Sequence, residues 1–160
     1  MAQQKSIVFY TMAPICSIAF LNGPNLNMLG MREPDLYGHQ TLADIEAGCR
    51  RLANEKQLEI DWYQSNLEGE LITKIQSLAG SVDWIVINAA GLTHTSVALR
   101  DALSLFPGGV IEVHLSNIHA RETFRHTSII SAVAKGVIAG FGAASYYMAI
   151  DAISHLHLET

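Results

Sequence analysis

The sequence predicts a single domain of the α/β class, in which a parallel sheet of five strands is covered by helices on both faces. Short apolar runs alternate with longer segments whose apolar residues recur every three or four positions, the pattern of strands joined by crossover helices. The run at 84–87 (WIVI) is continuously apolar, as expected of a strand that helices bury on both sides. At 160 residues and 49% hydrophobic content, the chain can bury one substantial core.

The first predicted strand, residues 18–21, stops at 22–25 (NGPN), because Asn, Gly and Pro favour turns. A long polar loop follows at about 26–38, and a loop of that length in a compact domain is typical of a lid or a binding loop. Thr41 can cap the first helix, with Asp44 completing a variant capping box. This region is predicted to contain a helix at 41–57, a strand at 58–65 and a helix at 68–79.

The second half of the chain continues the same alternation. It is predicted to contain strands at 82–88, 110–115 and 137–139, helices at 95–106 and 145–156, and a short helical segment at 127–134. Together these elements predict a flavodoxin-like, doubly wound, five-stranded parallel sheet. Ligands of such sheets bind outside the carboxyl ends of the strands. Polar residues follow three of the strands there: Asn25, Asn88, and His114 with Ser116.

Composition and charge argue against several classes of protein. The net charge of −5 disfavours nucleic acid as the main partner, since phosphate binding needs clustered Lys and Arg. No apolar run approaches the roughly 20 residues that span a bilayer, which disfavours a membrane protein. Cys16 and Cys49 lie in apolar segments and are expected to be buried free thiols in a reducing compartment, with a disulfide as the alternative.

Residues 1–13 are expected to be an appendage to the flavodoxin-like domain at 14–160, with Met12 as an alternative start. The apolar run after Lys5 is short and interrupted, and no small-residue cleavage site follows it. A secretory leader is therefore disfavoured, and a cytoplasmic location is expected.

Glu112, His114 and Ser116 occupy alternate positions of one predicted strand, so their side chains share a face. Polar side chains at the carboxyl end of a buried strand are not needed for packing. A glutamate two residues from a histidine can fix its tautomer and favour its protonated form. The alternative is a structural histidine whose hydrogen bond is satisfied by a core glutamate.

Further candidate ligands lie on the segments around this strand. Backbone amides near His94 could hold an anionic or hydroxylated ligand at a helix N-terminus, whereas simple capping, with Asp101 on a solvated face, is the alternative. Arg121 and Arg125 offer forked donors to a carboxylate or a hydroxyl-rich substrate, although surface arginines are common. The loop after the first strand adds a cation and a phenol, Arg32 and Tyr37.

Two other motifs do not support a site. The segment 140–145 (GFGAAS) resembles a dinucleotide fingerprint, but its third glycine is replaced and no second βαβ unit follows. The spacing of His114, His119 and His126 matches no familiar metal-ligand pattern. No metal site is predicted.

Five motifs, in order along the chain, closely resemble those of type II 3-dehydroquinate dehydratase: 22–27 (NGPNLN), 29–34 (LGMREP), 37–38 (YG), 93–101 (THTSVALRD) and 111–117 (IEVHLSN). The resemblance runs from about Ile18 to Tyr147. It implies a flavodoxin-like subunit, assembled as a homododecamer that is a tetramer of trimers. It also implies reversible dehydration of 3-dehydroquinate to 3-dehydroshikimate with no metal or organic cofactor.

The resemblance also implies catalytic roles for five residues of this sequence. Tyr37 would be the base that removes the C2 proton, and Arg32 would hold it as phenolate. Asn25 would help to stabilise the enolate. His114, braced by Glu112, would protonate the leaving C1 hydroxyl.

The remaining implied residues would bind the substrate or support the loop. Those implied for the substrate hydroxyls are Asn88, His94 and Arg125, and those implied for its carboxylate are Leu115, through its backbone amide, and Ser116. Asp101 would be contributed across the trimer interface, and Arg121 would support the lid. Residues 1–13, Leu67 and Ser145 depart from the family pattern.

Two other functions stay open at this point. One is a non-catalytic flavodoxin-like module that binds a flavin or a phosphorylated ligand. The other is a hydrolase-like enzyme with Ser116 and His114, although two residues on one strand have poor geometry for attack and no nucleophile elbow is present. Whether a dehydratase would serve aromatic amino acid biosynthesis in the shikimate pathway or quinate catabolism is also open, because both use the same chemistry.

Overall fold

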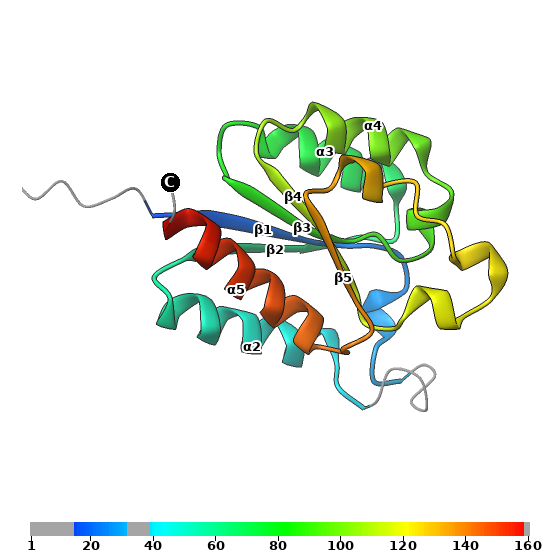
Figure 1. The fold of residues 1–160 in the computed structure, drawn as a ribbon, viewed down its shortest axis with the longest axis horizontal. Helices are drawn as coiled ribbons and strands as arrows, with labels where there is room; N and C mark the ends of the chain where they lie inside the picture. Colours follow the sequence, from blue (N-terminus) through cyan, green and yellow to red (C-terminus); the bar gives the residue numbers. More distant parts are fainter. Residues whose placement is uncertain (1–14, 32–38, 159–160) are drawn as a thin grey trace, which may run out of the picture.

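Five parallel strands form one sheet in the order β2-β1-β3-β4-β5 in the computed structural model, which describes residues 15–31 and 39–158 (Figure 1). The strands are β1 (Ser17–Asn22), β2 (Glu59–Gln64), β3 (Trp84–Asn88), β4 (Gly109–His114) and β5 (Gly136–Ala139). This strand order is that of a flavodoxin-like, doubly wound sheet, so the predicted fold class is confirmed.

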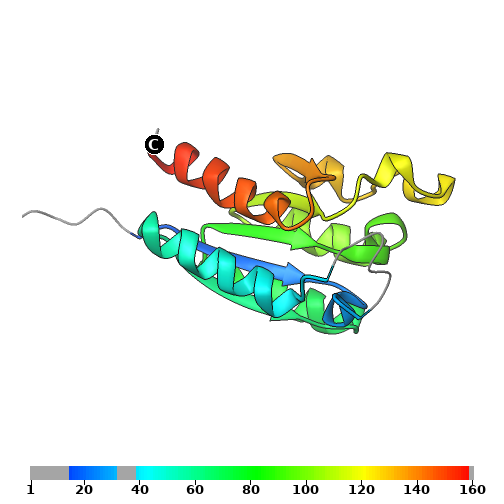
Figure 2. The ribbon, with the colours of Figure 1, turned by 90° about the horizontal axis from the view of Figure 1, so that it is seen from below.

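Helices cover both faces of the sheet (Figure 1), and Figure 2 looks onto one of these faces, with its two helices in front of the strands. The helices α2 (Leu42–Glu55) and α5 (Ala144–Leu158) lie on one face, and α3 (Glu68–Leu78) and α4 (Val97–Leu105) lie on the other. The predicted capping box is confirmed, because the Thr41 hydroxyl accepts from the Asp44 amide at 3.1 Å and the Asp44 carboxylate accepts from the Thr41 amide at 2.9 Å. None of the described helices is both long and apolar enough to cross a bilayer.

Most predicted elements agree with the structure to within two residues at each end, but the helical segment predicted at 127–134 is wrong. Only a 3-10 turn, Ser131–Val133, forms there. The hydroxyls of Ser128 and Ser131 both donate to the buried carboxylate of Glu112 instead, and the Ser131 amide donates to the Ser128 hydroxyl. Side chains that bond locally in this way compete with helix formation.

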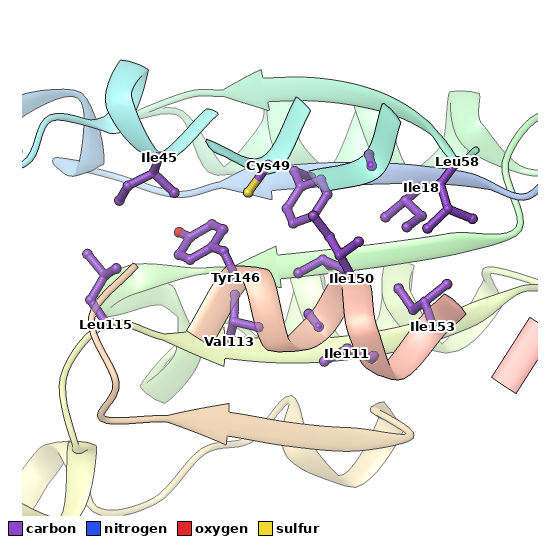
Figure 3. Packing of buried hydrophobic residues seen from close by; sticks show 14 of the residues in the cluster. Ile18, Ile45, Cys49, Leu58, Ile111, Val113, Leu115, Tyr146, Ile150 and Ile153 are labelled. Carbon is purple, nitrogen blue, oxygen red and sulfur yellow. The ribbon is translucent and has the colours of Figure 1, made fainter. Parts of the chain in front are cut away.

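The core is divided into two layers by the sheet, one under each pair of helices. Figure 3 shows the layer under α2 and α5, where Tyr146 lies among aliphatic residues and beside Cys49 (Figure 3). Cys16 and Cys49 are buried free cysteines, as predicted. Burial raises the pKa of Cys16 to about 11 and that of Cys49 to about 12, so both thiols stay protonated.

The chains that leave β1 and β3, neighbours in the sheet, run to opposite faces, to α2 and to α4. A doubly wound sheet binds its ligand at such a point. The turns after these strands are in close contact, because the Gly23 amide donates to the Asn88 carbonyl at 2.8 Å. A Cβ at Gly23 would lie 2.5 Å from the carbonyl oxygen of Ala89. Glycine is therefore required here to bring the turn that carries Asn25 against the turn that follows Asn88.

Candidate active site

A pocket opens at the carboxyl ends of β1, β3 and β4, and eight of the twelve residues proposed from the sequence line it. These eight are Asn25, Asn88, His94, His114, Leu115, Ser116, Arg121 and Arg125. A ninth, Glu112, is buried behind His114. The segment that carries Arg32 and Tyr37 lies outside the described residues.

His114 and Glu112 form a buried pair at the end of β4. Nε2 of His114 lies 2.6 Å from one carboxylate oxygen of Glu112, which leaves Nδ1 as the ring nitrogen that can face a ligand. The other carboxylate oxygen accepts from Ser128 at 3.0 Å and from Ser131 at 2.6 Å. Burial alone would raise the pKa of Glu112, but the hydrogen bonds from His114, Ser131 and Ser128 outweigh it and lower the pKa. Glu112 is therefore a charged carboxylate at neutral pH.

Asn25 sits in a turn that is held rigidly at the end of β1. Its φ of 69° lies in the left-handed region, which asparagine tolerates better than most residues. Its backbone amide donates to the side-chain oxygen of Asn66 at 2.8 Å. Asn66 follows the neighbouring strand β2, so this hydrogen bond ties the turn to the end of that strand. The side chain is thereby placed on the wall of the pocket.

Asn88 lies on the floor of the pocket at the end of β3 and is almost fully buried. Its side-chain oxygen accepts from the Ala90 amide at 3.2 Å, and its Nδ2 donates to the Tyr146 hydroxyl at 2.8 Å. An amide offers two protons and two lone pairs, so one of each is left for a ligand.

His94 lies at the end of a 3-10 turn, Ala90–His94, and the helix predicted to begin at residue 95 begins at Val97. The helix begins later because the Ser96 hydroxyl caps it by accepting from the Leu99 amide at 2.9 Å. Nδ1 of His94 lies 2.9 Å from the Thr127 carbonyl, which can only accept, so Nδ1 carries a proton and Nε2 is the other polar atom of the ring.

Arg121 and Arg125 give the outer wall of the pocket its positive charge. The Nε atoms of the two side chains lie 3.4 Å and 3.0 Å from one carboxylate oxygen of Glu122. A hydrogen bond from its own backbone amide and the two guanidinium groups lower the pKa of Glu122. A guanidinium offers five donors in a fixed planar fork, so this wall suits an anionic or hydroxyl-bearing ligand.

Asp101 lies outside the pocket as the described part of one chain forms it. Its side chain is 62% exposed on α4, and its Oδ1 lies 3.3 Å from a guanidinium nitrogen of Arg100. A single chain therefore leaves this predicted site residue away from the others.

Among the residues that the sequence analysis missed, Ser128, Ser131 and Tyr146 hold site residues through side-chain hydrogen bonds. The two serines lie in the segment predicted to be helical, and Tyr146 lies in a predicted helix, where its ring was indistinguishable from ordinary core. One signal was available for the serines, because a buried glutamate needs donors for both oxygens. In the described ranges no group of three or more His, Cys, Asp or Glu side chains is arranged to hold a metal ion.

Comparison with known proteins gives consistent matches. The family model described as "Dehydroquinase class II" matches residues 16–154. A 3-dehydroquinate dehydratase from Synechococcus sp. (strain WH7803) is 55% identical over 140 residues, covering 87% of this chain and 95% of that protein. One from Dinoroseobacter shibae is 56% identical over 140 residues, covering 87% and 93%.

Solved structures agree with these sequence matches. The crystal structure of a type II dehydroquinase from Butyrivibrio crossotus superposes with a TM-score of 0.86 at 42% identity, covering 88% of this chain and 99% of that one. A type II dehydroquinase from Propionibacterium acnes gives a TM-score of 0.84 at 40% identity, covering 87% and 96%.

Proposed function

This chain belongs to the class II dehydroquinase family, and we propose that it dehydrates 3-dehydroquinate through an enolate, with Tyr37 as the base and His114 as the general acid. The enzyme is a hydro-lyase, and its reaction is the dehydration of 3-dehydroquinate. The barrier of this reaction lies in removing a proton next to a ketone and in losing a hydroxide. A positioned base and a positioned acid each contribute about 10²–10⁴-fold to such a step.

The observation that carries the proposal is the buried pair of His114 and Glu112 in the pocket. A hydroxyl leaves readily only as water, so an acid must deliver a proton to it. The charged carboxylate of Glu112 stabilises the imidazolium ion from which that proton would come, and it also holds the ring in one orientation. With Nε2 bonded to Glu112, Nδ1 is the atom that would protonate the C1 hydroxyl.

The base is assigned to Tyr37 on the sequence motif. Tyr146, a tyrosine close to the pocket, is excluded as the base. Tyr146 lies beneath the pocket, but burial raises its pKa and its hydroxyl donates to Asn22 at 2.8 Å. A phenol in that state cannot accept a proton from the substrate. Arg32, five positions before Tyr37, would favour the phenolate, and Asn25 would donate to the enolate oxygen.

The pocket residues divide naturally between the two polar parts of the substrate. We assign its hydroxyls to Asn88, His94 and Arg125, and its carboxylate to the Leu115 amide and Ser116, while Arg121 supports the lid. The Leu115 carbonyl accepts from the Gly142 amide at 2.8 Å, so this end of β4 is held by the turn after β5.

Asp101 would complete the site of a neighbouring subunit in a trimer, and four trimers would form the dodecamer. Val97, Asp101 and Leu105 recur at intervals of four and so share one face of α4. Val97 is 62% exposed and Leu105 is 78% exposed in a single chain. A carboxylate flanked by two exposed aliphatic side chains fits a face that another subunit covers.

A direct assay tests the reaction. Purified protein mixed with 3-dehydroquinate should generate the ultraviolet absorbance of a conjugated enone, and activity should survive exhaustive chelation because no step proposed here uses a metal. Absence of the enone with correctly folded, assembled protein would refute the proposed reaction. We further propose that the enzyme works in the cytoplasm, in the shikimate pathway or in quinate catabolism.

A further inference from the structure

A chain of hydrogen bonds runs beneath the pocket and joins three elements of the fold. The hydroxyl of Tyr146, from α5, lies 2.8 Å from the side-chain oxygen of Asn22 and 2.8 Å from Nδ2 of Asn88. Asn22 and Asn88 are the last residues of β1 and β3 and are paired in register. All three side chains are buried, and the Tyr146 hydroxyl points toward the carboxyl end of the sheet (Figure 3).

The direction of every hydrogen bond in this chain is fixed by its far end. Nδ2 of Asn22 donates to the Tyr63 carbonyl at 3.2 Å, and a carbonyl can only accept, so the Asn22 oxygen must face Tyr146. That oxygen can also only accept, so the Tyr146 phenol donates to it. The phenol oxygen then accepts from Nδ2 of Asn88, and the Asn88 oxygen turns toward the Ala90 amide.

The Tyr146 phenol, whose proton sets this direction, is surrounded by aromatic side chains and stays protonated. The Tyr146 ring stacks with Phe20 at a centroid distance of 6.1 Å and lies 5.9 Å from Trp62. Burial raises the pKa of Tyr146, so the phenol stays neutral and remains a donor to Asn22. The ring is anchored by apolar contacts that a phenylalanine would keep.

We propose that Tyr146 is a positioning residue, whose hydroxyl fixes which end of the Asn88 amide meets the substrate hydroxyls. The inference rests on the proposed function, since it assigns Asn88 to substrate binding. Without the hydroxyl, the Asn88 amide loses one of its two restraints and the Asn22 oxygen loses its donor. The substrate would then meet a mobile or turned amide, which weakens binding more than it slows the proton transfers at Tyr37 and His114.

Tyr146→Phe tests this directly, because it removes one oxygen atom and keeps the stacked ring. We expect the KM for 3-dehydroquinate to rise about tenfold, the effect of one buried hydrogen bond, with kcat changed less than about threefold. Tyr147→Phe is the matched control. It removes a hydroxyl from the next residue of α5, which lies over Gly48 of α2 rather than at the pocket, and both kinetic constants should stay at wild-type values.

A double-mutant comparison with Asn88 distinguishes a positioning role of the Tyr146 hydroxyl from a general effect of Tyr146→Phe on the fold. Quinate carries the carboxylate and hydroxyls of the substrate without its ketone, so calorimetric titration with quinate measures binding without turnover. In an Asn88→Ala background, Tyr146→Phe should change the Kd of quinate less than about twofold, because its target is gone. An undiminished effect in that background, or a folded Tyr146→Phe enzyme with a wild-type KM, overturns the proposal.

A second variant covers the case in which Tyr146→Phe does not fold. Asn22→Ala removes the acceptor that orients the phenol, and Asn22 itself is buried away from the pocket lining. It should raise the KM and the Kd of quinate in the same direction as Tyr146→Phe, and a wild-type KM in this variant also overturns the proposal. Binding and turnover of the wild-type protein distinguish failure of the two proposals. If wild-type protein binds quinate but does not turn over 3-dehydroquinate, the proposed reaction fails, while titrations with quinate still decide the coupling between Tyr146 and Asn88. If wild-type protein neither binds quinate nor turns over 3-dehydroquinate, the proposed reaction and the positioning role of Tyr146 both fail.

Discussion

Nε2 of His114 lies 2.6 Å from the carboxylate of Glu112, and both side chains are buried, with His114 in the pocket lining and Glu112 behind it. The second oxygen of the carboxylate is held by two serines from the segment between β4 and β5. The charge of Glu112 is thus fixed in place by three donors, and the His114 ring is fixed by that charge. This arrangement leads to the first two predictions.

His114→Ala should lower kcat by about 10²–10⁴-fold, the contribution expected of a positioned acid, with a much smaller effect on KM. Steady-state kinetics with 3-dehydroquinate checks this. His119→Ala is the control, because His119 is an exposed histidine on the neighbouring 3-10 turn, Ile118–Ala120. A His114→Ala enzyme with kcat within a few fold of wild type would show that His114 is a structural histidine.

Glu112 should make the fold sensitive to acid. Its pKa in the folded protein is lowered from 4.5, so its contribution to stability is present above about pH 4.5 and is lost as the pH falls through the lowered value. Glu112→Gln should therefore lower the free energy of unfolding at pH 7 and make it less dependent on pH below 4.5. Urea unfolding at a series of pH values measures this, with the exposed Glu59→Gln as control. Equal acid sensitivity in wild type and Glu112→Gln would contradict the prediction.

Tyr37→Phe should abolish turnover while quinate still binds, because it keeps the ring and removes only the base. An unperturbed tyrosine, with a pKa near 10, is ionised in only about one molecule in a thousand at pH 7. Arg32→Ala should therefore move the rise of kcat with pH to higher pH, since the phenolate loses its cation. Tyr63→Phe, whose hydroxyl lies 3.4 Å from Glu70, is the control. Substantial turnover by Tyr37→Phe would exclude Tyr37 as the base.

Gly23→Ala should destabilise the fold by about 1–3 kcal/mol and lower activity, because the new methyl group would push the Asn25 turn away from Ala89. Gly69→Ala is the opposite case, since nothing lies within 4 Å of a Cβ there and the residue is in helix α3. It should leave stability unchanged or raise it by up to about 1 kcal/mol. Chemical denaturation and the enone assay compare the two variants. Equal stabilities would contradict the close contact between Gly23 and the Ala89 carbonyl.

Asp101 can be tested by complementation between two defective subunits. Asp101→Ala and His114→Ala subunits should each be weakly active alone, whereas hybrids made by co-expression should regain activity. Some sites in a hybrid would pair an intact His114 with an intact Asp101 from a neighbour. Hybrids no more active than the sum of the two parents, or a folded and fully active monomer, would remove Asp101 from the site.

The sequence by itself determined the fold class and the polar lining of the pocket in the described part of the chain. The alternation of strand and helix patterns is a local property, and so is the placement of Glu112 and His114 on one face of a strand, because side chains two apart on a strand point the same way. The residues that follow parallel strands also meet at one edge of the sheet, which is why Asn25, Asn88 and His114 could be assigned to one site.

Only the tertiary structure decided which buried polar groups satisfy one another. Tyr146 is 58 residues from Asn88 and 124 residues from Asn22, and the serines that hold Glu112 lie in a segment whose sequence favoured helix. A periodic pattern identifies the buried face of an element, but it carries no information about the partner that packs there. The hydrogen bonds of Tyr146, and with them the orientation of Asn88, therefore arise from the packing of α5 on the sheet.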